Sequence, residues 1–130
     1  MLKRLVEALA GVDMAFLMNH NVPRLYDSGV RYASPKPGNG GGAYQAWRDT
    51  PALLRSGSGT CMELVAWRLA EALMYEGRNV EPLITCKWMN LNGRDGLVFH
   101  VQIVDNQDNS IEDPSAELGM GQDQWAVFED

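Results

Sequence analysis

Residues 60–104 constrain the fold most, because a helix with a defined start is followed there by two strand patterns. Thr60 and Glu63 fit a capping box, in which each side chain binds the backbone amide of the other residue. The helix is expected over residues 60–76, and Gly77 suits the left-handed conformation that often follows a helix. Its polar stripe is expected at the surface and comprises Glu63, Arg68, Glu71, Tyr75 and Glu76.

The sequence after this helix contains apolar and alternating stretches that are typical of strands. We predict strands at residues 80–89 and 97–104 around a turn at 90–96, and a short third strand at 110–112. Strands joined by short turns pair antiparallel. The predicted architecture is therefore α+β, with N-terminal helices packed on a small antiparallel sheet.

The N-terminal part of the chain contains one helical pattern and one long irregular segment. Apolar residues at helical spacing predict an amphipathic helix over residues 2–18, with or without a break at Gly11. Prolines and the glycine run at 38–42 interrupt residues 19–50, which are expected to form a long surface loop, either ordered for function or with a disordered tip. With 130 residues in all, the chain is expected to form a single domain, 1–130.

Charge, hydropathy and cysteine content limit the kinds of partner and the cellular compartment expected for the chain. The net charge of -6 and the pI near 4.8 argue against nucleic acid, because phosphate binding relies on lysine and arginine. No apolar run approaches the roughly 18 residues that a membrane span requires, so no membrane partner is expected. Cys61 and Cys86 are too few for a disulfide framework. Both are expected to be free thiols in a reducing cytoplasm, and no cofactor is expected.

Cys61 is the candidate nucleophile, because it occupies the first position of the predicted helix. A helix N-terminus stabilises a thiolate, so the thiol pKa is expected below the ordinary value of about 8.5. The glycines within residues 56–59 would let a substrate backbone approach, and the Cys61 amide can donate to a developing oxyanion. The alternative is a structural cysteine, since free cysteines are among the most buried residues.

His100 and Asp113 are the candidate partners of this thiol. His100 lies in the alternating strand, on the same face as Gln102, and Asp113 ends the third strand directly before Pro114. Taken alone, each residue fits an ordinary strand histidine or turn aspartate. A hairpin turn before the third strand would bring Asp113 beside His100 and orient its ring. We therefore predict that Cys61, His100 and Asp113 converge as nucleophile, base and orienting carboxylate.

With these residues in place, the chain resembles the transglutaminase-like cysteine peptidases, in a short form encoded by tailed bacteriophages. The matching stretches extend from residue 25 to 120 and are, in chain order, LYDSGVRY (25–32), WRD (47–49), GTC (59–61), HV (100–101), DPS (113–115) and LGM (118–120). The resemblance implies a papain-like core and assigns Cys61, His100 and Asp113 to the catalytic triad. It also implies a thiol hydrolase that cleaves or transfers an amide acyl group through a thioester.

The same resemblance implies a polypeptide or peptidoglycan-like substrate, other phage structural proteins as partners, and a place in the host cytoplasm during infection or in the virion. The chain departs from the family at Thr60 and Met62, where acidic residues are common. One alternative is therefore a non-catalytic virion or assembly module that retains the fold. Another is a cell-wall amidase, a class that usually carries a second histidine or another polar residue in place of Asp113.

Other residues of the chain are candidates for supporting roles or for a metal site. Trp47 or Gln45 is a candidate second oxyanion donor, because related thiol hydrolases use a side chain upstream of the cysteine, and core packing is the alternative for Trp47. Cys86 is expected to pack in the sheet. A zinc site is not expected, because structural zinc uses closely spaced ligand pairs and the available residues are scattered: His20, Cys61, Cys86 and His100.

Overall fold

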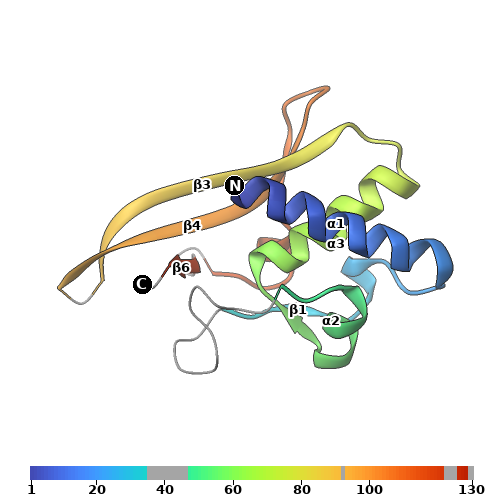
Figure 1. The fold of residues 1–130 in the computed structure, drawn as a ribbon, viewed down its shortest axis with the longest axis horizontal. Helices are drawn as coiled ribbons and strands as arrows, with labels where there is room; N and C mark the ends of the chain where they lie inside the picture. The colour runs from blue at the N-terminus through green and yellow to red at the C-terminus, as the bar shows by residue number, and fades with distance from the viewer. Residues whose placement is uncertain (35–46, 92, 122–125, 129–130) are drawn as a thin grey trace.

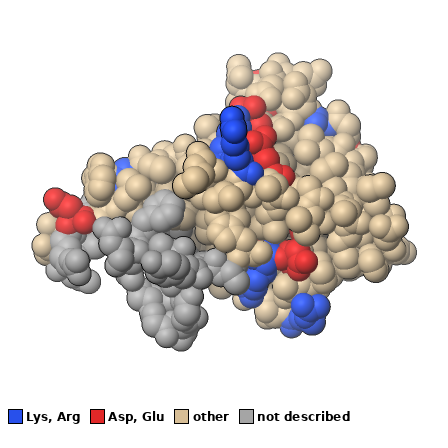
Figure 2. Space-filling model, in the orientation of Figure 1, with Lys and Arg blue, Asp and Glu red and all other residues tan. Residues whose placement is uncertain are grey.

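The structure, a computed structural model of the chain, describes residues 1–34, 47–91, 93–121 and 126–128. Its architecture is α+β, as predicted. Figure 1 shows the helices gathered at one end, while the hairpin of strands β3 and β4 extends away from them as a long two-stranded ribbon. In the view of Figure 2, lysine, arginine and acidic side chains form small separate groups on a surface of mainly uncharged residues.

The longest helices begin where the sequence signals predict. The helical elements are α1 (Leu2–Asn19), the 3-10 helix η1 (Leu25–Asp27), α2 (Thr50–Ser56), α3 (Cys61–Tyr75) and α4 (Pro114–Glu117). Helix α3 starts with the predicted capping box, and Gly77 follows it with a φ of 60°. Helix α1 continues through Gly11 without a break, which settles that alternative.

Strand β4 (Arg94–Asp105) is the centre of the main sheet. It pairs antiparallel with β3 (Val80–Leu91) along one edge, and with the short strands β5 (Ile111–Glu112) and β6 (Ala126–Phe128) along the other. The antiparallel prediction is thus confirmed, and β6 was not predicted. A separate parallel pair joins β1 (Arg31–Tyr32) to β2 (Ser58–Gly59), the segment just ahead of Cys61.

The turn between β3 and β4 is shorter than the predicted 90–96. Leu91 pairs with Arg94, so only residues 92–93 connect the strands. Gly93 has a φ of 87°, and its amide donates to the Asn90 side chain at 2.9 Å. Asn-Gly is a strong two-residue hairpin signal, and reading it would have given the longer strands.

The segment 19–50 is less irregular than predicted, because η1, β1 and the first residue of α2 fall within it. Its glycine run, 38–42, lies outside the described residues. Cys86 lies in β3 as predicted, but it is exposed rather than packed.

The core lies between α1, α3 and the adjacent face of the sheet. Its largest cluster combines Val6, Leu9, Cys61, Val65, Phe99, Val101 and Ile103 with other apolar residues of these elements. The predicted polar stripe of α3 is wrong at two positions, since Glu63 and Glu71 are each 1 % exposed. Both carboxylates face into the protein, where arginine side chains bind them.

Candidate active site

Cys61 lies at the first position of α3, as predicted, but it is 1 % exposed. Burial raises the pKa of its thiol to about 12; the amides of Val101, Met62 and Cys61 itself lower that pKa only in part, and the charge of Asp113 raises it. The expectation of a low thiol pKa is therefore wrong for this conformation. A helix N-terminus lowers the pKa of a thiol that water can reach, whereas desolvation dominates for a buried one.

The hydrogen bond to Val101 places the thiol at the edge of β4. The amide of Asn106 donates to the Asn79 carbonyl, toward β3, and the amide of Asp105 donates to the Ser110 carbonyl, toward β5. Because amides alternate in direction along a strand, the Val101 amide also points away from β3. On that edge, β6 pairs with residues 97–99 and β5 with 103–104. Cys61 therefore approaches the strand between β5 and β6.

His100 and Asp113 form a direct pair, as the sequence predicts. The His100 Nε2 and Asp113 Oδ2 atoms are 2.7 Å apart, and the His100 side chain is 4 % exposed. Burial of Asp113 acts to raise its pKa, but hydrogen bonds from His100, Ala116 and Gln102 outweigh it, so the pKa is lowered. Asp113 is thus held ionised, and it also caps α4 through the Ala116 amide at 3.2 Å.

The relation of Cys61 to this pair is indirect in the described contacts. Side chains alternate along β4, so His100 lies on the sheet face opposite Val101. The thiol meets the strand at its edge, through the Val101 amide, and the charge of Asp113 acts on it. The structure thus brings His100 and Asp113 together and places Cys61 beside the next residue of the strand. Convergence of all three within hydrogen-bond reach stays a prediction.

Two residues of this region were missed by the sequence analysis. Gln102 donates its side-chain amide to Asp113 Oδ2 at 3.1 Å, the oxygen that also contacts His100. Its position two residues after His100, on the same strand face, was the available signal.

Tyr32 is the second missed residue. Burial raises the pKa of the Tyr32 hydroxyl to about 12, and the charges of Cys61 and Asp113 add to this rise. A hydrogen bond from Ser34 lowers the pKa in part. The Tyr32 amide donates to the Leu118 carbonyl at 3.0 Å, and Tyr32 lies opposite Gly59 in the parallel pair. Tyr32 therefore lies between the segment that precedes Cys61 and the one that follows Asp113.

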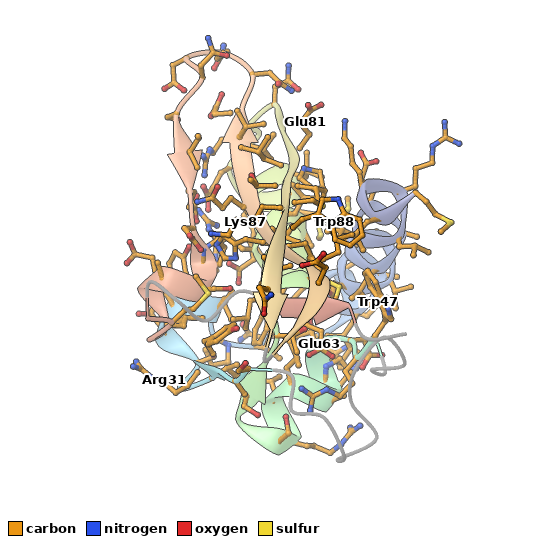
Figure 3. The ribbon with its side chains drawn as sticks, turned by 90° about the vertical axis from the view of Figure 1, so that its left-hand side faces the viewer. Arg31, Trp47, Glu63, Glu81, Lys87 and Trp88 are labelled. Atoms are coloured by element: carbon orange, nitrogen blue, oxygen red, sulfur yellow. The ribbon has the colours of Figure 1, made fainter. Side chains whose placement is uncertain are left out.

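The two glycines upstream of Cys61 differ, since Gly57 is exposed with open space around it and Gly59 is buried. A side chain at Gly59 would lie 3.1 Å from Leu64 and 3.2 Å from Leu53, so this glycine permits close packing and not the approach of a substrate. Trp47 packs against the core cluster that contains Cys61. Figure 3 shows Trp47 and Glu63 at the same end of the molecule. A role for Trp47 as oxyanion donor stays a prediction, and Gln45 lies outside the described residues.

Comparisons with known proteins give no match: no family model, no curated protein and no solved structure matches the sequence. Within the described residues, no three histidine, cysteine or acidic side chains are grouped so as to hold a metal ion. None of the helices in this part of the chain has the length and apolarity needed to cross a membrane.

Proposed function

We propose that the chain is a thiol hydrolase with a papain-like, transglutaminase-type core, in which Cys61 is the nucleophile and His100 the general base. Asp113 is the carboxylate that orients His100. The observation that carries the proposal is the part-buried His100–Asp113 pair at 2.7 Å, one residue along β4 from Val101, whose amide lowers the pKa of the Cys61 thiol. A thiol, an imidazole and an ionised carboxylate in this order supply the roles that acyl transfer requires.

The pairing with Asp113 defines which ring nitrogen acts as base. An ionised carboxylate only accepts hydrogen bonds, so the His100 proton belongs on Nε2, which faces Asp113 Oδ2. Nδ1 then carries the lone pair. The raised pKa of Cys61 means that the resting residue is a neutral thiol. Its proton therefore moves to Nδ1 when the sulfur attacks, and not before.

The reaction follows from these roles. The Cys61 sulfur attacks the amide carbonyl carbon while its proton passes to His100, and a C–S bond forms. The tetrahedral intermediate expels the amine, which takes the proton from His100, and an acyl thioester remains. Water or a second amine then gives a proton to His100 and attacks the thioester. Release of the acid or new amide returns the proton to the sulfur.

The substrate class rests on the resemblance of the motifs, from residue 25 to 120, to phage-encoded members of this family. We infer an amide bond in a polypeptide or peptidoglycan-like polymer as the acyl donor. The same resemblance supports a role during phage infection, in the host cytoplasm or packaged in the virion with other structural proteins.

Acetylation by p-nitrophenyl acetate tests the proposal without knowledge of the substrate. Intact-mass spectrometry should detect one acetyl group on Cys61, with a burst of p-nitrophenolate. Both should be lost in Cys61→Ala and in His100→Ala, and Cys86→Ser should retain them as the matched control. An acetyl group that stays in Cys61→Ala, or that is confined to Cys86, would refute the enzyme.

A second candidate function is a non-catalytic virion module that keeps the fold. The burial of Cys61, at 1 % exposure with a raised thiol pKa, favours this alternative. Iodoacetamide labelling separates the two. Exposed Cys86 should be labelled before Cys61 in both cases, which is the opposite of the order implied by the low Cys61 pKa expected from the sequence. A slower second phase at Cys61 that depends on His100 supports the enzyme, whereas a phase unchanged in His100→Ala supports the module.

A further inference from the structure

The carboxylate of Glu112, the residue directly before Asp113, binds three side chains. Its Oε2 accepts from the Tyr26 hydroxyl at 2.5 Å and from Arg68 Nε at 2.6 Å, and its Oε1 accepts from Arg78 Nη1 at 3.0 Å. The side chain is 21 % exposed. One carboxylate thus receives three donors, two of them charged, which gives short and strong hydrogen bonds.

Two of these donors connect Glu112 to elements that carry the candidate triad. Arg68 lies on α3, about two turns after Cys61 on the same helix. Arg78 also binds Asp105, the last residue of the strand that carries His100, at 3.3 Å. Glu112 itself directly precedes Asp113 in the chain. A single side chain therefore links the helix of Cys61, the strand of His100 and the backbone of Asp113.

The backbone holds Asp113 through two short elements, β5 before it and α4 after it, where the Glu117 amide donates to the Asp113 carbonyl at 3.1 Å. Strand β5 has only two residues, which pair with Ile103 and Val104 of β4. Elements this short contribute few backbone hydrogen bonds, so side-chain contacts add to them in fixing the position of Asp113. Glu112 supplies those contacts from the side of α3, while His100 and Gln102 hold the Asp113 carboxylate itself.

We propose that Glu112 is a positioning residue, whose carboxylate, by binding Tyr26, Arg68 and Arg78 together, holds Asp113 in hydrogen-bond contact with His100. The expected effect of Glu112 on catalysis rests on the proposed function, whereas its expected effect on the His100 ring does not. The role differs from general stabilisation, because it predicts a specific change at one imidazole ring.

Imidazole NMR of the whole chain tests this role, because the protein contains only two histidines, His20 and His100. The wild type should show a Nε2-protonated His100 with a downfield Hε2 resonance protected from exchange by Asp113. Glu112→Gln should move that resonance upfield and speed its exchange, while exposed His20 stays unchanged. Glu76→Gln is the matched control, since Glu76 also binds Arg68 and Arg78 but caps the C-terminus of α3 and is not adjacent to Asp113 in the chain.

The outcomes separate the two proposals. In the acetylation assay, Glu112→Gln should slow the reaction of Cys61 by about 10- to 100-fold, the size expected for a misplaced catalytic group. If Glu112→Gln does not fold, Tyr26→Phe removes one donor without a charge and should shift His100 in the same direction. An unchanged His100 resonance, or an equal change in Glu76→Gln, overturns the positioning role. A shifted resonance in a protein with no ester reaction overturns only the proposed enzyme.

Discussion

Helix α3 is held at both ends by arginine and glutamate side chains, but the two ends use them differently. At the N-terminal end, Glu63 accepts from Arg48 Nε at 2.9 Å, from Arg48 Nη2 at 3.0 Å and from the Arg48 amide at 2.7 Å. The Thr60 amide and hydroxyl add contacts at 3.0 and 3.1 Å. The Glu63 side chain is 2 % exposed, so this end relies on one buried charge.

At the C-terminal end, two arginines share several acidic side chains. Arg68 contacts Glu71, Glu76 and Glu112, and Arg78 contacts Glu76, Asp105 and Glu112. Water reaches this network, since the side chains of Glu76 and Glu112 are 30 % and 21 % exposed. Glu76 and Glu112 each bind both arginines, so each keeps one of them when the other is lost. Glu71 is the exception, because its ion pair is with Arg68 and its side chain is 2 % exposed.

The two ends of α3 should differ in how well they tolerate the loss of a charged partner. A buried ion that loses its partner keeps its full desolvation cost, whereas a partly exposed ion in a shared network loses little. The end of α3 that carries Cys61 is therefore the less tolerant one. The end that supports Asp113 can change without unfolding the chain, which makes the role of Glu112 accessible to mutation.

The largest expected effect is that of Arg48→Met. It leaves the Glu63 carboxylate buried without its guanidinium and should lower the free energy of unfolding by roughly 3–5 kcal/mol. Arg78→Met is the matched change at the other end and should cost less, roughly 1–2 kcal/mol, because Arg68 still binds Glu76 and Glu112 and the Gln107 amide still binds Asp105. Urea denaturation measures both. Equal losses would show that burial of the charge does not decide the cost.

The next effect concerns Asp13, which lies at the same end as Glu63 and accepts from the Thr50 amide at 2.7 Å. Burial raises its pKa from 3.8 to about 7; Thr50 lowers it in part, and Asp49 and Glu63 raise it by repulsion. Between pH 3.8 and about 7, Asp13 of the folded chain holds a proton that Asp13 of the unfolded chain has released. Stability should therefore fall as pH rises through this window, by roughly 4 kcal/mol.

Asp13→Asn supplies the control for that pH dependence. The amide carries no charge at any pH, so the variant should lack most of the slope between pH 4 and 7 and be more stable than the wild type at pH 8. Thermal unfolding at several pH values measures this. An identical slope in the variant would place the titrating group elsewhere.

The sequence predicts the elements that depend on local signals. The capping box at Thr60 defines the start of α3, because both partners lie within one turn. Alternation along residues 97–104 identifies β4 and places His100 and Gln102 on one face. The His100–Asp113 pair followed from a hairpin turn between adjacent strands, which is also a local relation.

The features that were missed depend on residues far apart in the chain. Strands β1 and β6 have two and three residues, too few for a periodic pattern, and each forms only against a distant partner. Glu63 looks like a surface residue until Arg48 is known to bind it. The pKa of Cys61 follows from its burial beside Val101, 40 positions later in the numbering, and not from its place in the helix.

A smaller effect is expected for the capping box itself. Thr60→Ala removes the hydroxyl that contacts Glu63 but keeps the Thr60 amide and all donors of Arg48, so it should cost about 1 kcal/mol. Thr60→Ser restores the hydroxyl and should recover most of the loss in the same urea experiment. A loss as large as that of Arg48→Met would mean that the cap, and not the arginine, stabilises the buried carboxylate.

The smallest effect is expected for the ion pair between Lys3 and Glu81, which has the same charges as Arg48 and Glu63 but lies at the surface. Its atoms are 3.4 Å apart, and the side chains are 44 % and 40 % exposed. Water solvates both ions whether or not they meet, so Glu81→Ala should change the free energy of unfolding by less than about 0.5 kcal/mol. Added salt should remove even that difference. A loss above about 1 kcal/mol, comparable with that of Thr60→Ala, would contradict this explanation. Exposure would then not be the property that decides how much stability is lost when an ion pair of this protein is broken.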